Sequence, residues 1–266
     1  MERLARFLFI ILVGFASGFA SGAFGIGGGS ITTPAIRLLL MESSGIALGT
    51  PLPIIFPSAL VGGLNYYRAG KIRKDLVIVC SLNGLAGAVL GSLATGVVDT
   101  RYIMILTALF LLYLAYRTLE SALRGEATPE ARGKAREGTG SLAVKAGVGF
   151  AAGFFSGFMG LGGGTILVPA FLFLLHMDVK EALGNSLVVI AALAIPGMVI
   201  HTFLGHIDWL LALGMMVGVM PGSYVGSFFT LRARKRRVLL LFSMVLAAIG
   251  IIFMINEVRG LLAGAH

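Results

Sequence analysis

The sequence predicts an all-α polytopic membrane protein made of two inverted-topology repeats. Each repeat is expected to hold one glycine-broken, discontinuous helix segment and three further transmembrane helices. Three observations lead to this prediction: the apolar composition, a sequence repeat at a constant offset, and the placement of basic residues between the apolar stretches.

The composition is that of a membrane protein. Of the 266 residues, 57% are hydrophobic and only 12% are charged, and the mean hydropathy is +0.95. A soluble domain carries about 25% charged residues, so these charges are too few to cover a soluble surface. Six uninterrupted apolar stretches reach the length of about 20 residues that a bilayer requires. They lie at about 45–65, 76–98, 102–122, 181–203, 207–229 and 238–256.

The charge and the cysteine content exclude several classes of partner. A net charge of +9 could indicate nucleic-acid binding. The basic residues gather in short loops beside apolar stretches, however, which is typical of the cytoplasmic side of a membrane. We therefore expect a lipid bilayer and no nucleic acid as partners. The single cysteine, Cys80, leaves no disulfide framework or CxxC metal site, and no metal or cofactor is expected.

Internal similarity divides the chain into two halves. Residues 14–36 and 149–171 are identical at fourteen of 23 positions when they are aligned at an offset of 135. The same offset aligns ALGTPL at 47–52 with ALGNSL at 182–187. Such a repeat predicts two homologous units. The predicted units are a first membrane repeat at 1–122, a polar cytoplasmic linker at 123–141 and a second membrane repeat at 142–266.

Basic residues are mirrored between the two halves. The turn at 68–74 holds four Lys or Arg residues, whereas its counterpart near 201–208 holds none. Conversely, the turn at 232–237 is strongly basic and its counterpart near 99–101 is nearly neutral. The positive-inside rule produces this pattern when two repeats have opposite orientations. Both basic turns and the linker are therefore expected on the cytoplasmic side, and both termini on the other side.

Glycine triplets interrupt the two remaining apolar segments, 7–41 and 142–176. Glycine costs about 1 kcal/mol relative to alanine in a helix interior, so Gly27–Gly29 and Gly162–Gly164 should break each segment into two arms. The broken segments should enter and leave by the same face. Broken helices at corresponding positions of inverted halves indicate the substrate site of a transporter. The alternative is that the triplets serve only close helix packing, which is the role predicted for the small-residue stripes at Gly14, Gly18, Gly22 and at Gly149, Gly153, Gly157.

The residues around the breaks suit an anion. A helix start, at Ser30 or Thr165, follows each triplet, and helix N-termini bind anions without a basic side chain. Thr50, Asn185 and Ser186 offer short polar groups at the start of the next helix, where helix capping is the alternative role. The predicted substrate-binding residues are Gly27, Gly28, Gly29, Ser30, Thr50, Gly162, Gly163, Gly164, Thr165, Asn185 and Ser186. No catalytic or metal-binding residues are predicted.

Coupling to an ion has few candidates. No Asp or Glu lies in the middle of an apolar stretch, although buried carboxylates are common in proton-coupled carriers. Coupling would therefore depend on a histidine such as His201, on protonation of the substrate, or would be absent. The favoured interpretation of His201 is an interfacial side chain, and His176 and His206 are interpreted as loop residues.

A G-x-G-G-G-[ST]-x(3)-P motif is repeated at Gly25–Pro34 and Gly160–Pro169. With this motif, the sequence resembles the sulfite exporter TauE/SafE family over essentially the whole chain. The matched A-L-G-x-x-L motifs strengthen the resemblance. It implies an exporter of small sulfur-containing or organic anions such as sulfite, sulfoacetate or other organosulfonates. Such a protein is expected in the cell (inner) membrane of a prokaryote, with a homodimer as one possible assembly. An anion channel or a carrier of small carboxylates is the alternative, and an enzyme is not expected.

Overall fold

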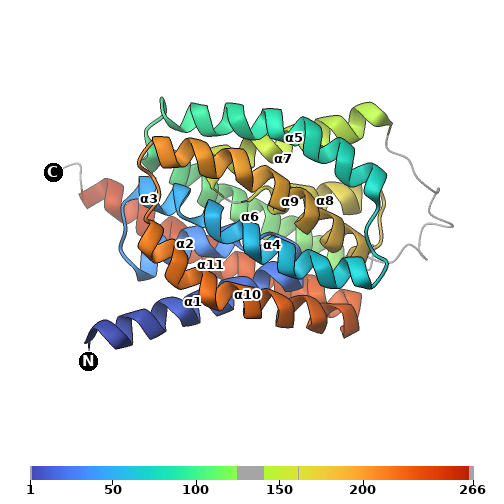
Figure 1. Cartoon of the computed structure of the whole chain (residues 1–266), viewed down its shortest axis with the longest axis horizontal. Coiled ribbons are helices and arrows are strands. Elements are labelled where there is room, and N and C mark those ends of the chain that lie inside the picture. Colours follow the sequence, from blue (N-terminus) through green and yellow to red (C-terminus); the bar gives the residue numbers. More distant parts are fainter. Residues whose placement is uncertain (1, 125–140, 161, 264–266) are drawn as a thin grey trace.

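The computed structural model of the chain describes residues 2–124, 141–160 and 162–263. These residues form eleven α-helices and no strand (Figure 1), which confirms the predicted all-α class. Eight helical segments are long and apolar enough to cross a membrane. In chain order the helices are α1 (Glu2–Phe24), α2 (Gly29–Leu39), α3 (Ser44–Gly49), α4 (Pro51–Arg68), α5 (Lys74–Thr95), α6 (Thr100–Arg124), α7 (Leu142–Met159), α8 (Gly164–Phe173), α9 (Val179–Phe203), α10 (Trp209–Arg232) and α11 (Lys235–Ala263).

Both predicted helix breaks are present, and each separates a long helix from a short one. α1 has 23 residues and α2 has 11, whereas α7 has 18 and α8 has 10. A helix rises about 1.5 Å per residue and the hydrocarbon core is about 30 Å thick. α1, at about 34 Å, is therefore long enough to cross the core and α7, at about 27 Å, nearly so, whereas the second helix of each pair reaches about halfway. The sequence predicted two arms at each break but not their unequal lengths.

Glycine stripes bring two pairs of helices into backbone contact. Three glycines of α1 lie against the backbone of α10, and three of α7 lie in the same way against α5. A Cβ at any of these glycines would clash, which confirms the predicted close packing. Because residue numbers rise together along both members of each pair, the two helices run in the same direction. The pairs are Gly14 with Met215, Gly18 with Val219 and Gly22 with Ser223, then Gly149 with Cys80, Gly153 with Gly84 and Gly157 with Ala88.

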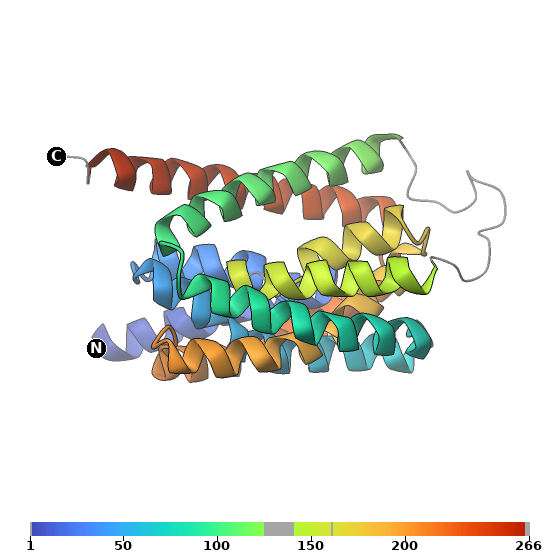
Figure 2. The same ribbon diagram turned by 90° about the horizontal axis from the view of Figure 1, so that it is seen from above.

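The remaining long helices form the centre and one face of the bundle. α4 and α9 run antiparallel, because Tyr66 near the end of α4 packs on Gly184 and Leu52 near its start packs on Gly197. α6 and α11 cross each other on one face (Figure 2). The short helices lie between the central pair, α4 and α9, and the pair on one face, α6 and α11. α2 contacts α4 and α11, and α8 contacts α9 and α6. The two breaks are thereby held inside the bundle.

Figure 1 shows which turns share an end of the bundle. The α4–α5 turn, the α10–α11 turn, the end of α6 and the start of α7 lie at one end. The start of α1, the end of α11 and the α5–α6 and α9–α10 turns lie at the other. An ion pair of 3.0 Å between Asp75 Oδ2 and Lys145 Nζ joins the starts of α5 and α7. Most of the predicted linker, residues 125–140, lies outside the described residues.

The glycine stripes lead to a stability prediction. Gly153→Leu should destabilise the protein by about 3 kcal/mol or more, because overpacking costs about 1–3 kcal/mol even where neighbours can shift. Here the obstacle is the backbone of Gly84, which cannot shift alone. Gly147→Leu is the control on the same helix, since no atom lies within 4 Å of its Cβ position. Thermal unfolding in detergent measures both, and equal stability of the two variants would contradict the packing argument.

Candidate functional site

The two breaks share one backbone conformation. Each contains three glycines with φ in the left-handed region, which favours glycine because it has no Cβ. The last of the three is the N-cap of the following short helix, and in neither helix does a side chain cap the first N–H groups. The φ values are 66° at Gly25, 71° at Gly27 and 85° at Gly28, and 64° at Gly160, 78° at Gly162 and 70° at Gly163.

The breaks lie against each other in the middle of the bundle. A Cβ on Gly164 would clash with the backbone of Ile26, and one on Gly162 would lie 3.5 Å from the Ile26 carbonyl oxygen. Two isoleucines cover the breaks. Ile190 Cγ2 of α9 lies 2.6 Å from the Cβ position of Gly27, and Ile55 Cδ1 of α4 lies 2.9 Å from that of Gly162. The breaks are buried in this structure, and apolar side chains close them off.

The matched A-L-G motifs contact the break of the opposite half. Leu183 packs on Gly25, and the backbone of Leu48 lies against Gly160. The Ser186 hydroxyl donates to the Gly25 carbonyl at 2.6 Å. Ser186, predicted as a site residue, is thus the one member of the A-L-G-x-x-L motifs whose side chain is hydrogen-bonded to a break.

Four buried serine hydroxyls have no hydrogen-bond partner among the described residues: Ser17, Ser30, Ser92 and Ser156. Ser30 lies in the first turn of α2. Ser156 Cβ lies 3.3 Å from the Cβ position of Gly163, and the Ser17 carbonyl oxygen lies 3.3 Å from that of Gly28. Leaving a buried hydroxyl unpaired costs about 1–3 kcal/mol. Ser17, Ser30 and Ser156 are therefore available to a ligand or to water beside the two helix starts, whereas Ser92 lies on α5 against Gly157.

Sequence reasoning identified Ser30 but missed the other three serines. Ser17 and Ser156 belong to the small-residue stripes that were interpreted as packing surfaces. A signal was present, because Ser156 has an identical counterpart, Ser21, at the 135-residue offset. Ser92 likewise has Ser227 as its counterpart. A hydroxyl retained at equivalent positions of both halves was the available clue.

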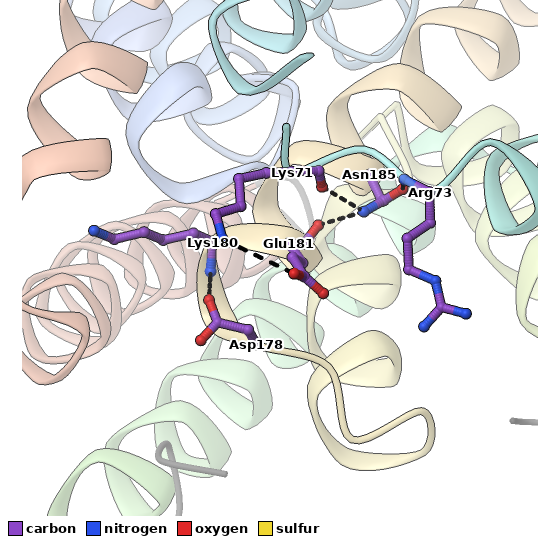
Figure 3. A network of polar contacts seen from close by, with 6 residues as sticks. All are labelled: Lys71, Arg73, Asp178, Lys180, Glu181 and Asn185. Atoms are coloured by element: carbon purple, nitrogen blue, oxygen red, sulfur yellow. Dashed lines mark hydrogen bonds and ion pairs between the residues drawn. The ribbon is translucent and has the colours of Figure 1, made fainter. Parts of the chain in front are cut away.

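Asn185 holds a turn in this structure (Figure 3). Its Oδ1 accepts from the Arg73 N–H at 2.7 Å. Its Nδ2 donates to the Lys71 carbonyl at 3.0 Å and to the Glu181 carbonyl at 2.7 Å. Lys71 Nζ also lies 3.9 Å from Glu181 Oε1. Asn185 thus fixes the basic α4–α5 turn against the start of α9.

Thr50 occupies the counterpart position in the first half. Its Oγ1 accepts from the Asp208 N–H at 3.0 Å, in the α9–α10 turn. Asp208 is the counterpart of Arg73 at the same offset, so the two bonds are equivalent. Both predicted polar residues are buried, and both bind a turn of the opposite half rather than a break.

The cations that lie nearest to the broken segments in sequence, Arg37 and Lys180, donate to backbone carbonyls near helix ends. Arg37 Nη1 donates to the Glu42 carbonyl at 2.8 Å, and Lys180 Nζ donates to the Leu231 carbonyl at 2.6 Å. The side chains described above at the breaks are all neutral. An anion there would therefore be held by N–H groups and hydroxyls.

A groove of about 360 Å³ lies away from the breaks, between α4, α5 and α9. Apart from Lys74 and Tyr67, its walls are hydrocarbon, which suits an apolar occupant better than an anion. Its lining residues are Ala59, Leu60, Gly63, Leu64, Tyr67, Ile72, Lys74, Val77, Ile78 and Val188.

The contacts of Asn185 lead to a second stability prediction. Asn185→Ala should cost about 1–3 kcal/mol, because it leaves the Arg73 N–H and the Lys71 carbonyl without this partner. Asn83→Ala is the control, since that exposed amide donates only to Val79 within its own helix, and it should change stability by less than about 0.5 kcal/mol. Thermal unfolding of both variants tests this, and an unaffected Asn185→Ala protein would show that the turn is held by other contacts.

Comparison with known proteins extends over nearly the whole chain. A family model described as "Sulfite exporter TauE/SafE" matches residues 10–253. The probable membrane transporter protein YunE of Bacillus subtilis is 23% identical, with 92% of this chain and 96% of YunE covered. The probable membrane transporter protein YdhB of the same organism is 29% identical, with 84% and 90% covered. A probable membrane transporter protein of Xylella fastidiosa is 26% identical, with 88% and 89% covered. No solved structure matches the chain.

Proposed function

The chain belongs to the sulfite exporter TauE/SafE family and is a multi-pass membrane transporter, not an enzyme, and on that premise we propose that it exports small anions by alternating access around the two glycine breaks. The proposed substrates are sulfite, sulfoacetate and other organosulfonates. The proposed location is the cell (inner) membrane of a prokaryote, and the bilayer itself follows from the family.

The observation that carries this proposal is the meeting of two uncapped helix starts, each preceded by a left-handed glycine. A helix N-terminus stabilises a partly buried anion by up to about 2 kcal/mol. Each hydrogen bond from Ser30, Thr165 or an unpaired serine hydroxyl adds about 1 kcal/mol. The sum corresponds to binding of about millimolar to micromolar strength. Such binding is weak enough for the substrate to leave on the far side.

We assign Gly27–Ser30 and Gly162–Thr165 to the substrate, together with Ser186. Thr50 and Asn185 act through the turns that they hold. Ile55 and Ile190, which occupy equivalent positions 135 residues apart, serve as the two gates. Both lie on the breaks in this closed structure, and withdrawal of one opens the site to one side of the membrane.

An inverted repeat supplies the symmetry that such gating requires. Two observations support it. The contact sets of α1 with α10 and of α7 with α5 are related by the 135-residue offset, with the halves exchanged. The counterpart helices α4 and α9 run antiparallel. The basic α4–α5 and α10–α11 turns share one end of the bundle, which we assign to the cytoplasm.

The topology is tested by cysteine labelling in a Cys80→Ala background. Lys71→Cys and Arg234→Cys should react only from the cytoplasmic side, because both basic turns lie at that end of the bundle. Val97→Cys, an exposed position in the α5–α6 turn, should react only from the other side. Impermeant thiol reagents applied to intact cells and to inverted vesicles measure this. Labelling of positions 71 and 234 from opposite sides would refute the inverted arrangement.

Transport is tested by counterflow in proteoliposomes with radiolabelled sulfite, methanesulfonate, sulfoacetate and acetate. Gly28→Ala and Gly163→Ala should lower counterflow at least about tenfold, because a side chain disfavours the left-handed conformation that opens each helix start. Saturable counterflow indicates a carrier, whereas single-channel currents would indicate a pore, and a preference for acetate would indicate a carboxylate carrier.

Gly70→Ala and Gly205→Ala are the matched controls. These turn glycines have φ of 68° and 69°, and nothing lies within 4 Å of their Cβ positions. They carry the same backbone penalty of about 1–2 kcal/mol but lie far from the breaks in sequence, and they should retain counterflow. Equal losses at all four glycines would show that strain alone, and not the site, accounts for the effect.

A further inference from the structure

Two histidines that are five residues apart in sequence form a pair at one end of the bundle. His201 is fully buried near the end of α9, and its Nε2 lies 3.0 Å from the Gly157 carbonyl oxygen of α7. His206 is half-buried in the α9–α10 turn. Their Nδ1 atoms lie 3.2 Å apart. Sequence reasoning treated His206 as a loop residue and did not pair the two.

The partners determine where the protons lie. A carbonyl oxygen only accepts, so Nε2 of His201 carries a proton and donates it to Gly157. In neutral His201 the Nδ1 atom is then an acceptor, and His206 must donate from its own Nδ1. This leaves Nε2 of His206 as the basic atom of the pair. That atom lies 3.3 Å from the Cβ position of Gly45, on the half-buried side of the pair.

The geometry allows one extra proton to pass through the pair. A proton that binds Nε2 of His206 makes that ring cationic. The Nδ1 proton of His206 can then cross the 3.2 Å to Nδ1 of His201. His206 becomes the neutral Nε2–H tautomer, and His201 becomes the cation with both N–H groups donating. A second proton is disfavoured because two adjacent rings would both be charged.

The buried end of the pair touches the second half's broken segment. Gly157 lies in the last turn of α7, just before the break that begins at Gly160. A cationic ring forms a stronger, charge-assisted hydrogen bond to the Gly157 carbonyl than a neutral ring does. In the first half the counterpart of His201 is Tyr66, whose hydroxyl donates to Gly22, the counterpart of Gly157, at 3.1 Å. The equivalent carbonyls are therefore anchored by different groups: a histidine, which can gain a proton, in the second half and a phenol in the first.

Two helices that contact the pair, α3 and α7, together carry one charged residue, Lys145, which lies at the opposite end of α7 from Gly157. α3 contributes Gly45 and Gly49, and α7 contributes the Gly157 backbone. Asp208, in the same turn as His206, caps α10 through Leu211. Asp99 and Arg101 lie at the start of α6, which reaches α3 through a Thr100–Ser44 hydrogen bond of 3.1 Å. Burial lowers the pKa of His206 below its usual value, which favours release of the proton.

We propose that His201 and His206 form a proton-binding site that makes the rate of anion transport depend on the pH on one side of the membrane. The proton enters and leaves through His206, on the side of the membrane opposite the basic turns. Its arrival at His201 strengthens the anchor on α7 and so changes the stability of the second break. This proposal rests on the proposed anion transport for its consequence, but proton binding by the pair is measurable alone.

Proton binding is tested by solid-state nitrogen NMR of the histidine-labelled protein in liposomes. Between about pH 8 and about pH 4, the pair should take up one proton, with His201 and His206 changing together. At high pH, His201 should be the Nε2–H tautomer and His206 the Nδ1–H tautomer. His206→Gln should remove the coupled change, whereas His176→Asn, at an exposed loop position, should remove only its own signal. Two independent titrations, or none, would overturn the proposal.

The effect on transport is tested with radiolabelled methanesulfonate, which stays ionised and so cannot take up the proton itself. When the pH is changed only on the side opposite the basic turns, between about pH 8 and about pH 4, the counterflow rate of the unmodified protein should change at least about threefold. His201→Gln keeps an N–H donor for Gly157 but does not titrate. It should retain counterflow within about twofold at high pH and lose the pH dependence, with His176→Asn retaining both. A pH dependence that persists in His201→Gln would overturn the proposal.

Two outcomes separate this proposal from the one on which it rests. If His201→Gln also loses counterflow, His206→Gln decides, because it leaves the Gly157 hydrogen bond in place. A pH dependence of counterflow that survives in that variant overturns the proposal, and its selective loss supports it. If the unmodified protein shows no counterflow with any of the four anions, the anion-transport proposal fails. The NMR titration still decides whether the pair binds a proton.

Discussion

The structure depends on one constraint, which is that a helix broken inside a bilayer must not expose its unpaired backbone groups to hydrocarbon. Each such group costs several kcal/mol in lipid. Here each break shields the other, since Gly164 lies against Ile26 and Ile55 and Ile190 cover both. The described residues of both breaks are buried within the bundle. Among the described residues, what remains is a set of serine hydroxyls without a partner and the first N–H groups of two short helices that no side chain caps, which is the chemistry that an anion requires.

That shielding is only possible because the two halves interlock. α1 of the first half packs on α10 of the second, and α7 packs on α5, through glycines whose neighbours are backbone atoms. Hydrophobic burial does not hold helices together in lipid, so close van der Waals contact must do so. The A-L-G motifs extend the exchange, because Leu183 lies on Gly25 and Leu48 on Gly160. Neither break is built by one half alone.

Much of the fold follows from local signals in the sequence. The helix breaks were predicted because consecutive glycines act locally, and the close crossings because small residues recur every four positions. The roles of single polar residues were harder to predict. Asn185 looks like a helix cap or a ligand until its partners at Lys71 and Arg73 are known. The pairing of His201 with His206 depends on the turn at 204–208, which bends the chain back, and no sequence pattern encodes that return.

The differences between equivalent positions carry more information than the similarities. Asn185 and Thr50 hold equivalent turns with different groups, and Tyr66 and His201 anchor equivalent carbonyls with different acidities. In the proposed inverted repeat, two identical halves would give inward-open and outward-open states of equal energy. A transporter alternates when those states differ by only a few kcal/mol, so a small asymmetry is enough to bias it. Only the second half has an anchor, His201, that can gain a proton. The bias between the two states therefore depends on the protonation of His201, and no carboxylate in the membrane is needed.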